Sequence, residues 1–93
     1  MEAALWYVLA GTSGGPNRVR ILQALADRPR NPNQLAEDLS LNYDTVRHHL
    51  DVLEGNDVVR SSGDEYGAVY LPSDRVRERW DTVETITNEV NPS

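Results

Sequence analysis

Apolar and polar positions alternate along the chain with two different periods, and together they predict four helices, a hairpin and a last helix. Residues 2–10 are mostly apolar and predict a short helix that ends at Gly11. After the loop GTSGGPN, Pro16 suits the first turn of a second helix, which Pro29 ends. One face of this helix carries apolar residues at helical spacing: Val19, Leu22, Leu25 and Ala26.

The third helix has a recognisable start. Asn31, Pro32 and Gln34 have the spacing of a capping box, in which two side chains bind free backbone N–H groups at the helix start. A helix is therefore expected at 32–39, and a break at 40–42 separates it from the next one. Its inner face is expected to consist of Leu35, Ala36 and Leu39.

The fourth helix is predicted at 43–54, with Asn42 as its N-cap. Its apolar residues recur every three or four positions, as the buried face of a helix requires. They are Val46, Leu50 and Leu53. Gly55 and Asn56 are expected to end the helix in a left-handed conformation. Joined by three residues, the helices at 32–39 and 43–54 form a helix-turn-helix.

β-Branched and aromatic residues then predict a hairpin at 58–71, which begins at Val58 and Val59. Its turn is expected at Ser62-Gly63-Asp64 and its return strand at 66–71. A hairpin in this position after a helix-turn-helix would form a wing.

The chain ends in a region that predicts one long amphipathic helix at 73–90, capped by Ser73. Apolar residues recur there at alternating spacings of four and three, close to the coiled-coil period. They are Val76, Trp80, Val83, Thr87 and Val90. They form a single apolar stripe on an otherwise charged helix.

The composition limits what the chain can be. Ninety-three residues fit one domain, so residues 1–93 are predicted to form a single domain. The absence of cysteine excludes disulfides, thiolate metal sites and cysteine nucleophiles. No apolar run approaches the roughly 20 residues that span a bilayer. We therefore expect no membrane association and a cytoplasmic location.

Acidic residues outnumber basic ones by 15 to 9, which gives a net charge of −6. All nine basic residues are arginine, and lysine is absent. Such a composition is typical of proteins from halophilic archaea; a GC-rich genome that prefers arginine codons is the alternative. Phosphates repel an acidic chain, but in molar salt the Debye length is about 3 Å and screening weakens that repulsion.

The run ILQAL, followed by NQLAEDLSLNYDTVRHHLDVLEGNDVV, resembles winged helix-turn-helix regulators of the ArsR kind. Their pattern is ILxxL and then LAxxLxLSxxTVxxHLxxLxxxGLV, and the match runs from about Arg18 to Val59. The resemblance implies a mainly α fold with a small β-hairpin, in which the N- and C-terminal helices form a dimer contact. It also implies binding to double-stranded DNA, with helix 43–54 in the major groove. With the composition, it indicates a regulator of haloarchaeal type.

Three features depart from the family pattern. Asn56-Asp57 stands where the family usually has Gly-Leu. The wing tip, Gly63-Asp64-Glu65, is acidic where basic residues usually contact phosphates. The cysteine metal sites of some members are missing, so we expect no metal and no cofactor.

Residues for DNA contact are expected on two surfaces. The exposed N-terminal half of helix 43–54 offers hydrogen-bonding side chains, including a guanidinium that can bind guanine with two bonds. These residues are Asn42, Tyr43, Asp44, Thr45, Arg47 and His48. For Asp44 and His48 a solvated surface is an equally good interpretation. Phosphate contacts are expected from Arg18, Arg20, Arg30 and Arg60.

The two histidines are adjacent, which disfavours a metal site. Neighbouring helical residues point about 100° apart, so His48 and His49 do not converge on one ion. His49 borders the inner face and is expected to be a hydrogen-bonded packing residue. A nucleophile motif, a phosphate loop and an isolated carboxylate pair are all missing from the sequence, so we expect no enzymatic activity.

The terminal helices carry more apolar surface than a domain of this size covers easily. We expect them to form a homodimer contact across a two-fold axis. Packing within one chain is the alternative for Trp6. The expected contact residues are Leu5, Trp6, Leu9, Val76, Trp80, Val83 and Thr87.

The sequence therefore predicts a homodimeric, sequence-specific regulator of transcription that binds duplex DNA. A winged-helix module that binds a protein partner in place of DNA is the alternative, because helix 43–54 and the wing tip carry several acids.

Overall fold

A computed structural model describes residues 1–63 and 67–91 of the chain. The architecture is mostly helical with one two-stranded antiparallel hairpin, as predicted. No helix within the described ranges has the length and apolarity needed to cross a bilayer. In chain order the elements are α1 (Glu2–Ala10), α2 (Gly15–Asp27), α3 (Pro32–Leu39), α4 (Tyr43–Gly55), β1 (Val59–Ser62), β2 (Val69–Pro72), α5 (Asp74–Arg77) and α6 (Trp80–Val90).

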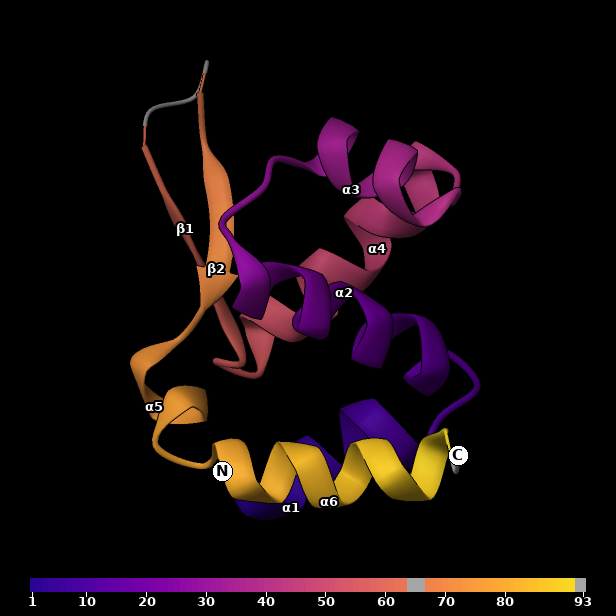
Figure 1. Cartoon of the computed structure of the whole chain (residues 1–93), viewed down its shortest axis with the longest axis vertical. Coiled ribbons are helices and arrows are strands. Elements are labelled where there is room, and N and C mark those ends of the chain that lie inside the picture. Colours follow the sequence, from indigo (N-terminus) through magenta and orange to yellow (C-terminus); the bar gives the residue numbers. More distant parts are fainter. Residues whose placement is uncertain (64–66, 92–93) are drawn as a thin grey trace.

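The elements form two groups at opposite ends of the molecule, with α2 between them (Figure 1). The first and last helices, α1 and α6, lie side by side at one end. α3, α4 and the hairpin lie toward the other end, and the strands extend away from α1 and α6 (Figure 1). α2 contacts α1, α3, α4, α6 and β2, so both groups pack against one helix.

The hydrophobic core is continuous from the α1–α6 layer through α2 to α4 and the hairpin. The three residues predicted to face inward on α4 are fully buried. On α2 the prediction fails at Ala26, which is exposed, while Ile21 is buried. The reason is that α2 packs against α1 and α6 in addition to α3 and α4. Its buried face therefore differs from the one that the apolar spacing predicted. On α3, Leu35 is fully buried, whereas Ala36 and Leu39 are partly buried.

Side-chain caps fix the predicted helix starts. Asn31 Oδ1 accepts a hydrogen bond from the Gln34 amide at 2.8 Å, and Gln34 Oε1 accepts one from the Asn31 amide at 2.9 Å. These two bonds confirm the capping box at α3. Asn42 caps α4 by accepting from the Asp44 amide at 2.8 Å. The Ser73 hydroxyl caps α5.

The end of α4 differs from the prediction. Neither Gly55 nor Asn56 is left-handed; the residue with positive φ is Asp57, at 60°. The Asn56 side chain donates to the Val52 carbonyl at 2.8 Å, which keeps Asn56 close to the helix and moves the reversal one residue on. Aspartate tolerates this conformation better than most residues. The Asp57 carbonyl then accepts a hydrogen bond from the Ser73 hydroxyl at 2.6 Å.

The single helix predicted at 73–90 is wrong, because the structure contains two helices there. α5 and α6 are separated by a break at Arg79, whose φ of −116° and ψ of 27° are not helical. The break directs the chain from the hairpin onto α1, which a straight helix would not do (Figure 1). It also lets Val76 and Ile86 both reach the core. Ile86 lies off the predicted stripe and is a core residue that the pattern missed.

The wing is shorter than predicted. β1 pairs with β2 from Val59 opposite Pro72 to Ser62 opposite Val69. The return strand therefore begins at Val69 and not at residue 66. Part of the predicted turn, return strand and acidic tip lies outside the described residues: Asp64, Glu65 and Tyr66.

The segment between α2 and α3 is paired with the wing. Arg30 and Tyr70 exchange two backbone hydrogen bonds, of 3.2 Å and 2.8 Å, in an antiparallel bridge. The base of β2 is therefore attached to the start of the helix-turn-helix as well as to β1.

One glycine is required by close packing between helices. α2 begins at Gly15, where an added Cβ would lie 2.3 Å from the Leu9 carbonyl oxygen of α1. Any other side chain would force the two helices apart, so the contact between α1 and α2 depends on this glycine.

We expect Asn31→Ala to lower the free energy of unfolding by about 1 kcal/mol, because the Gln34 amide loses its acceptor at the start of α3. Urea unfolding followed by circular dichroism measures the change. Asn33→Ala is the matched control, since Asn33 is exposed in the same turn and its side chain has no hydrogen-bond partner among the described residues. Equal losses in the two variants would contradict a capping role for Asn31.

Candidate nucleic-acid interface

The turn between α3 and α4 determines how α4 is presented. Ser40 ends α3 in a left-handed conformation, with φ of 56°. The Leu41 amide donates to the Ala36 carbonyl at 2.9 Å, and the Leu41 side chain packs against the core. Asn42 is exposed, but its side-chain oxygen is occupied by the cap of α4. Three residues thus reverse the chain and leave one side of α4 uncovered.

The first two turns of α4 carry polar side chains on that uncovered side. Tyr43 is 46% exposed, and Asp44 and His48 are also exposed. Thr45 and Arg47 are half-buried at its edges. We call these five residues the α4 face. Sequence reasoning had selected all five. Asp44, Thr45 and His48 line one cleft, and Tyr43 and Arg47 line another beside the wing.

Arg47 links the α4 face to the wing. Its Nη1 donates to the Tyr70 hydroxyl of β2 at 3.0 Å, and its Nη2 lies 3.6 Å from Asp51 Oδ1. The hydrogen bond to Tyr70 is the largest cause of a raised pKa for Arg47, followed by the charge interaction with the same phenol. The Arg47 side chain remains 39% exposed. Arg47 is therefore a permanent cation that is oriented by β2 and still accessible.

Of the two other residues around Arg47, Asp51 was expected among the acids of helix 43–54, whereas Tyr70 was missed by sequence reasoning. Asp51 has a clear signal, because it follows Arg47 by four positions on a helix. The sequence signal for Tyr70 is weak, because aromatic residues are common in β-strands. Nothing in the local sequence shows that the Tyr70 hydroxyl meets a side chain 23 positions away.

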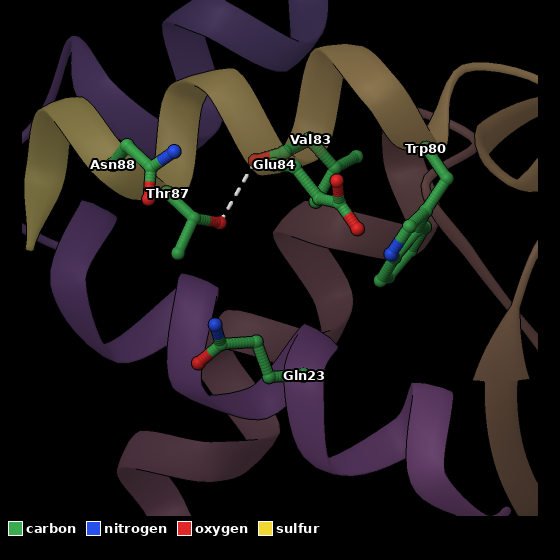
Figure 2. A pocket seen from close by; sticks show the side chains of 6 residues that line it. All are labelled: Gln23, Trp80, Val83, Glu84, Thr87 and Asn88. Carbon is green, nitrogen blue, oxygen red and sulfur yellow. Dashed lines mark hydrogen bonds between the residues drawn. The ribbon is translucent and has the colours of Figure 1, made fainter.

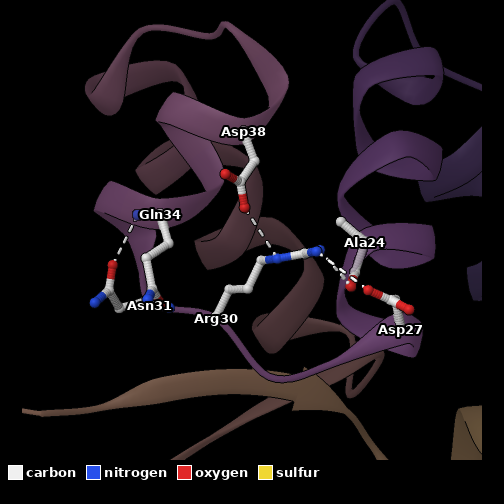
Figure 3. Close-up of polar contacts among 6 residues, drawn as sticks. All are labelled: Ala24, Asp27, Arg30, Asn31, Gln34 and Asp38. Carbon is white, nitrogen blue, oxygen red and sulfur yellow. Dashed lines mark hydrogen bonds and ion pairs between the residues drawn. The ribbon is translucent and has the colours of Figure 1, made fainter.

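Arg30 fastens α2 to α3, which corrects its predicted role as a phosphate contact (Figure 3). Its Nη1 donates to the Ala24 carbonyl at 2.6 Å. Its Nη2 lies 3.3 Å from Asp27 Oδ2, and its Nε lies 3.1 Å from Asp38 Oδ2. The side chain is only 12% exposed. A guanidinium that is largely buried between two carboxylates is a poor ligand for a further anion.

Arg18 is also inside the molecule, contrary to the surface position expected for it. It is 6% exposed, and its Nε donates to His49 Nδ1 at 3.1 Å. Its Nη1 donates to the Val8 carbonyl at 3.2 Å and to the Thr12 hydroxyl at 2.9 Å. His49 is likewise 6% exposed. The prediction that His49 is a hydrogen-bonded packing residue is therefore confirmed.

The other two predicted phosphate contacts are exposed. Arg20 donates to Asn17 Oδ1 at 3.2 Å and to the Leu39 carbonyl at 2.7 Å. Arg60 lies on β1, and its side chain has no hydrogen-bond partner among the described residues. Both are therefore accessible to a ligand.

The described residues include no group of three histidine, aspartate or glutamate side chains that could hold a metal ion. The rings of His48 and His49 have centroids 5.6 Å apart, but Nδ1 of His49 already accepts a hydrogen bond from Arg18. The adjacent histidines therefore have separate roles.

Four of the residues predicted to form a dimer contact belong to the core of one chain, which corrects their assignment. They are Leu5, Leu9, Val76 and Val83, each at most 2% exposed. The reason is that α1 and α6 pack on each other, so these residues are covered without a partner chain. Trp6 is 37% exposed, and Tyr7, which was not predicted, is 62% exposed. These two aromatic residues form the apolar surface of α1.

Trp80 and Thr87 line a groove between α6 and α2 (Figure 2). The groove has a volume of about 300 Å³, and Gln23 forms its α2 side. The Thr87 hydroxyl donates to the Val83 carbonyl at 2.8 Å. Both residues are half-buried. Their part in a dimer contact stays a prediction.

The sequence matches a family model from residue 15 to residue 61, just over half of the chain. The model describes bacterial regulatory proteins of the arsR family. The chain belongs to the arsR family. In this arsR-family protein the matched segment spans α2, the helix-turn-helix and most of β1, the elements that build and support the α4 face.

Solved structures share the fold of this arsR-family chain. The homodimeric winged helix-turn-helix DNA-binding domain Mb0332 from Mycobacterium bovis, a possible ArsR-family regulator, is 21% identical, with a TM-score of 0.73 over 94% of this chain and 77% of that one. Rv0081 from M. tuberculosis is 26% identical, with a TM-score of 0.73 over 95% and 86%. The transcriptional regulator HlyU from Vibrio vulnificus is 20% identical, with a TM-score of 0.70 over 90% and 84%. No curated protein matches the sequence.

Burial lowers the pKa of His49 below its ordinary value of 6.5, and the positive charge of Arg18 lowers it further. The neutral ring then accepts the Arg18 hydrogen bond through Nδ1. Between the lowered pKa and 6.5 the unfolded chain binds more protons than the folded chain. The stabilisation is therefore fully present above that range and is lost as the pH falls through it.

We therefore expect the free energy of unfolding of this arsR-family protein to decrease as the pH is lowered from neutral through 6.5 toward the lowered pKa of His49. Denaturant unfolding at several pH values measures the slope. His49→Gln should reduce the slope, because glutamine does not titrate. His48→Gln, at an exposed position on the same helix, should keep most of it. A slope that His49→Gln leaves unchanged would contradict the assignment.

Proposed function

We propose that this arsR-family protein is a transcriptional regulator that binds double-stranded DNA sequence-specifically as a homodimer. The observation that carries the proposal is the α4 face, five polar residues on the first two turns of the second helix of a helix-turn-helix. In this motif such residues meet base edges in the major groove. The arsR-family match supports the same function.

The side chains of the α4 face suit base edges and phosphates. Arg47 can bind the O6 and N7 acceptors of guanine with two hydrogen bonds, while Tyr70 sets its direction. Thr45 offers a hydroxyl to a base edge and a methyl to thymine. Tyr43 and His48 extend from the same turns toward the backbone or a base edge. Arg20 and Arg60, which are both exposed, supply further phosphate contacts.

The dimer part of the proposal rests on α1. Trp6 and Tyr7 leave aromatic surface exposed there, at the end of the molecule away from the wing (Figure 1). The Mycobacterium bovis domain with the same fold is homodimeric. Two-fold symmetry would place two copies of α4 in successive major grooves, about 34 Å apart.

We also propose that binding takes place at high salt, as in a halophilic archaeon. The support is the composition: every basic residue is arginine, and the net charge is −6. At molar salt, counterion release contributes little to affinity and repulsion between the chain and DNA is screened. Hydrogen bonds and shape would then carry most of the affinity.

A protein partner is the second candidate ligand of the α4 face. The observation that favours it is the presence of Asp44 and Asp51 beside Arg47, which makes the helix surface acidic overall. A basic partner protein would complement this charge, whereas duplex DNA would not.

Selection from pooled random duplexes in about 1 M potassium chloride separates these candidates. Enrichment of an inverted repeat, with half-sites about one helical turn apart, is the expected result. If a sequence is enriched at low salt but not at molar salt, the proposal that binding takes place at high salt is contradicted. The absence of any enriched sequence from a folded dimer would contradict the DNA-binding proposal and favour a protein partner.

We expect Arg47→Ala to weaken binding to the selected duplex at least tenfold, because a charged hydrogen bond contributes about 1.5–3 kcal/mol. Fluorescence anisotropy measures the affinity, and sedimentation should show an unchanged dimer. Arg75→Ala is the matched control, since it removes the same charge from α5, where Arg75 pairs with Asp57 at 3.2 Å.

Tyr70→Phe tests the orientation of Arg47 separately. The guanidinium remains but loses its hydroxyl partner, so we expect a smaller loss of affinity than for Arg47→Ala. Wild-type affinity of Arg47→Ala would show that the α4 face does not read DNA through this residue.

A further inference from the structure

A cleft lies between the loop that precedes α2 and the first turns of α4. Its volume is about 440 Å³. It borders the α4 face, because Asp44, Thr45 and His48 form one of its sides. The other side is formed by Ser13, Gly14 and Arg18, and His49 lies between the two sides.

Arg18 presents one unused nitrogen to this cleft. Its Nε and Nη1 donate to His49, Val8 and Thr12, but its Nη2 has no hydrogen-bond partner among the described residues. A Cβ added at Gly14 would lie 2.9 Å from that Nη2. Glycine therefore keeps the space beside the guanidinium open. A side chain that is 94% buried thus retains two N–H donors on the cleft side.

The charge of Arg18 is uncompensated within the described part of the chain. All its hydrogen-bond acceptors are neutral, and none of the ion pairs among the described residues involves it. Arg30 is the contrast: it is similarly buried but lies between Asp27 and Asp38. Burying a cation without an anion is costly, so a site that supplies an anion from outside would be favoured.

The start of α2 adds further positive character. The helix is 13 residues long, its N-cap is Gly14, and no side chain caps it. The Gly15 amide already donates to the Thr12 carbonyl at 3.1 Å and Pro16 has no N–H, so the contribution of this helix start to anion binding is the positive end of the helix dipole. Because Gly14 itself lines the cleft, this helix start and Arg18 Nη2 converge on the same space.

We propose that this cleft binds one phosphate group through Arg18 Nη2 and the Ser13 hydroxyl, at the positive end of the α2 dipole. We expect this group to be a backbone phosphate of duplex DNA beside the groove that α4 occupies. This expectation rests on the proposed function. A free phosphate ion has the same chemistry and is the other source. Asp44 lines the cleft as well and opposes an anion there, so it limits the affinity.

The first experiment titrates the free protein with inorganic phosphate at constant ionic strength and follows the Arg18 Nε–H and Gly14 amide signals by NMR. Ser13→Glu places a carboxylate at the exposed rim of the cleft and should abolish a saturable shift. Thr85→Glu, at an exposed position of α6 that lines none of the described grooves, adds the same charge and should not. Asp44→Asn should tighten phosphate binding about two- to fivefold.

The second experiment uses the selected duplex with one phosphate at a time replaced by an uncharged methylphosphonate. In the wild type, replacement at one position in each half-site should weaken binding about tenfold. In Ser13→Glu the same replacement should have no further effect. Thr85→Glu should respond as the wild type does.

The outcomes are distinct. If replacing one phosphate weakens DNA binding by the wild type but not by Ser13→Glu, the cleft binds a backbone phosphate of DNA. If inorganic phosphate causes a saturable NMR shift that Ser13→Glu abolishes, but no replaced phosphate weakens DNA binding, the cleft binds free phosphate. This conclusion holds even if the protein binds no DNA. If Ser13→Glu and Asp44→Asn change neither measurement, the proposal is overturned, whatever the outcome of the DNA selection.

Discussion

The central position of α2, which packs against helices at both ends of the molecule, is the constraint on which the other elements depend. α1 and α6 contact it at one end of the molecule, and α3, α4 and β2 contact it at the other. Its buried apolar residues therefore belong to one core that both groups share. A domain of this size buries too little surface to form a second core. Gly15 permits the close approach of α1 that this arrangement needs. A shift of α2 would disturb the terminal helices and the helix-turn-helix together.

Arginine side chains provide the polar connections between these elements. Arg18 joins α2 to α1 and α4, Arg30 joins α2 to α3, and Arg47 joins α4 to β2. A guanidinium suits this use because its several donors lie in one plane and can bind separate acceptors at fixed directions. With Arg20, Arg75 and Arg77, which also donate to protein acceptors, at least six of the nine arginines have partners within the described residues. Fewer cations are left to attract phosphates at the surface.

Local signals determined how much could be predicted from the sequence. The capping residues Asn31, Asn42 and Ser73 act within three positions of themselves, so the helix starts were correct. The inner face of α4 and the composition of the α4 face followed from helical periodicity. The break at Arg79 was hidden, because an apolar stripe continues across it. The contacts of Arg18 with His49 and of Arg47 with Tyr70 join residues 31 and 23 positions apart, and no local pattern encodes them.

Tyr70 makes the wing and α4 parts of one rigid body. Its backbone is paired with Arg30, its ring is buried, and its hydroxyl holds Arg47. The residues that fix the relative orientation of the two elements are therefore different from Thr45 and His48, which make no hydrogen bond or ion pair with the wing among the described residues. Substitutions at those two positions can alter which ligand is preferred without changing the angle between helix and wing. Single substitutions at these positions can therefore change which ligand the protein prefers while the fold is preserved.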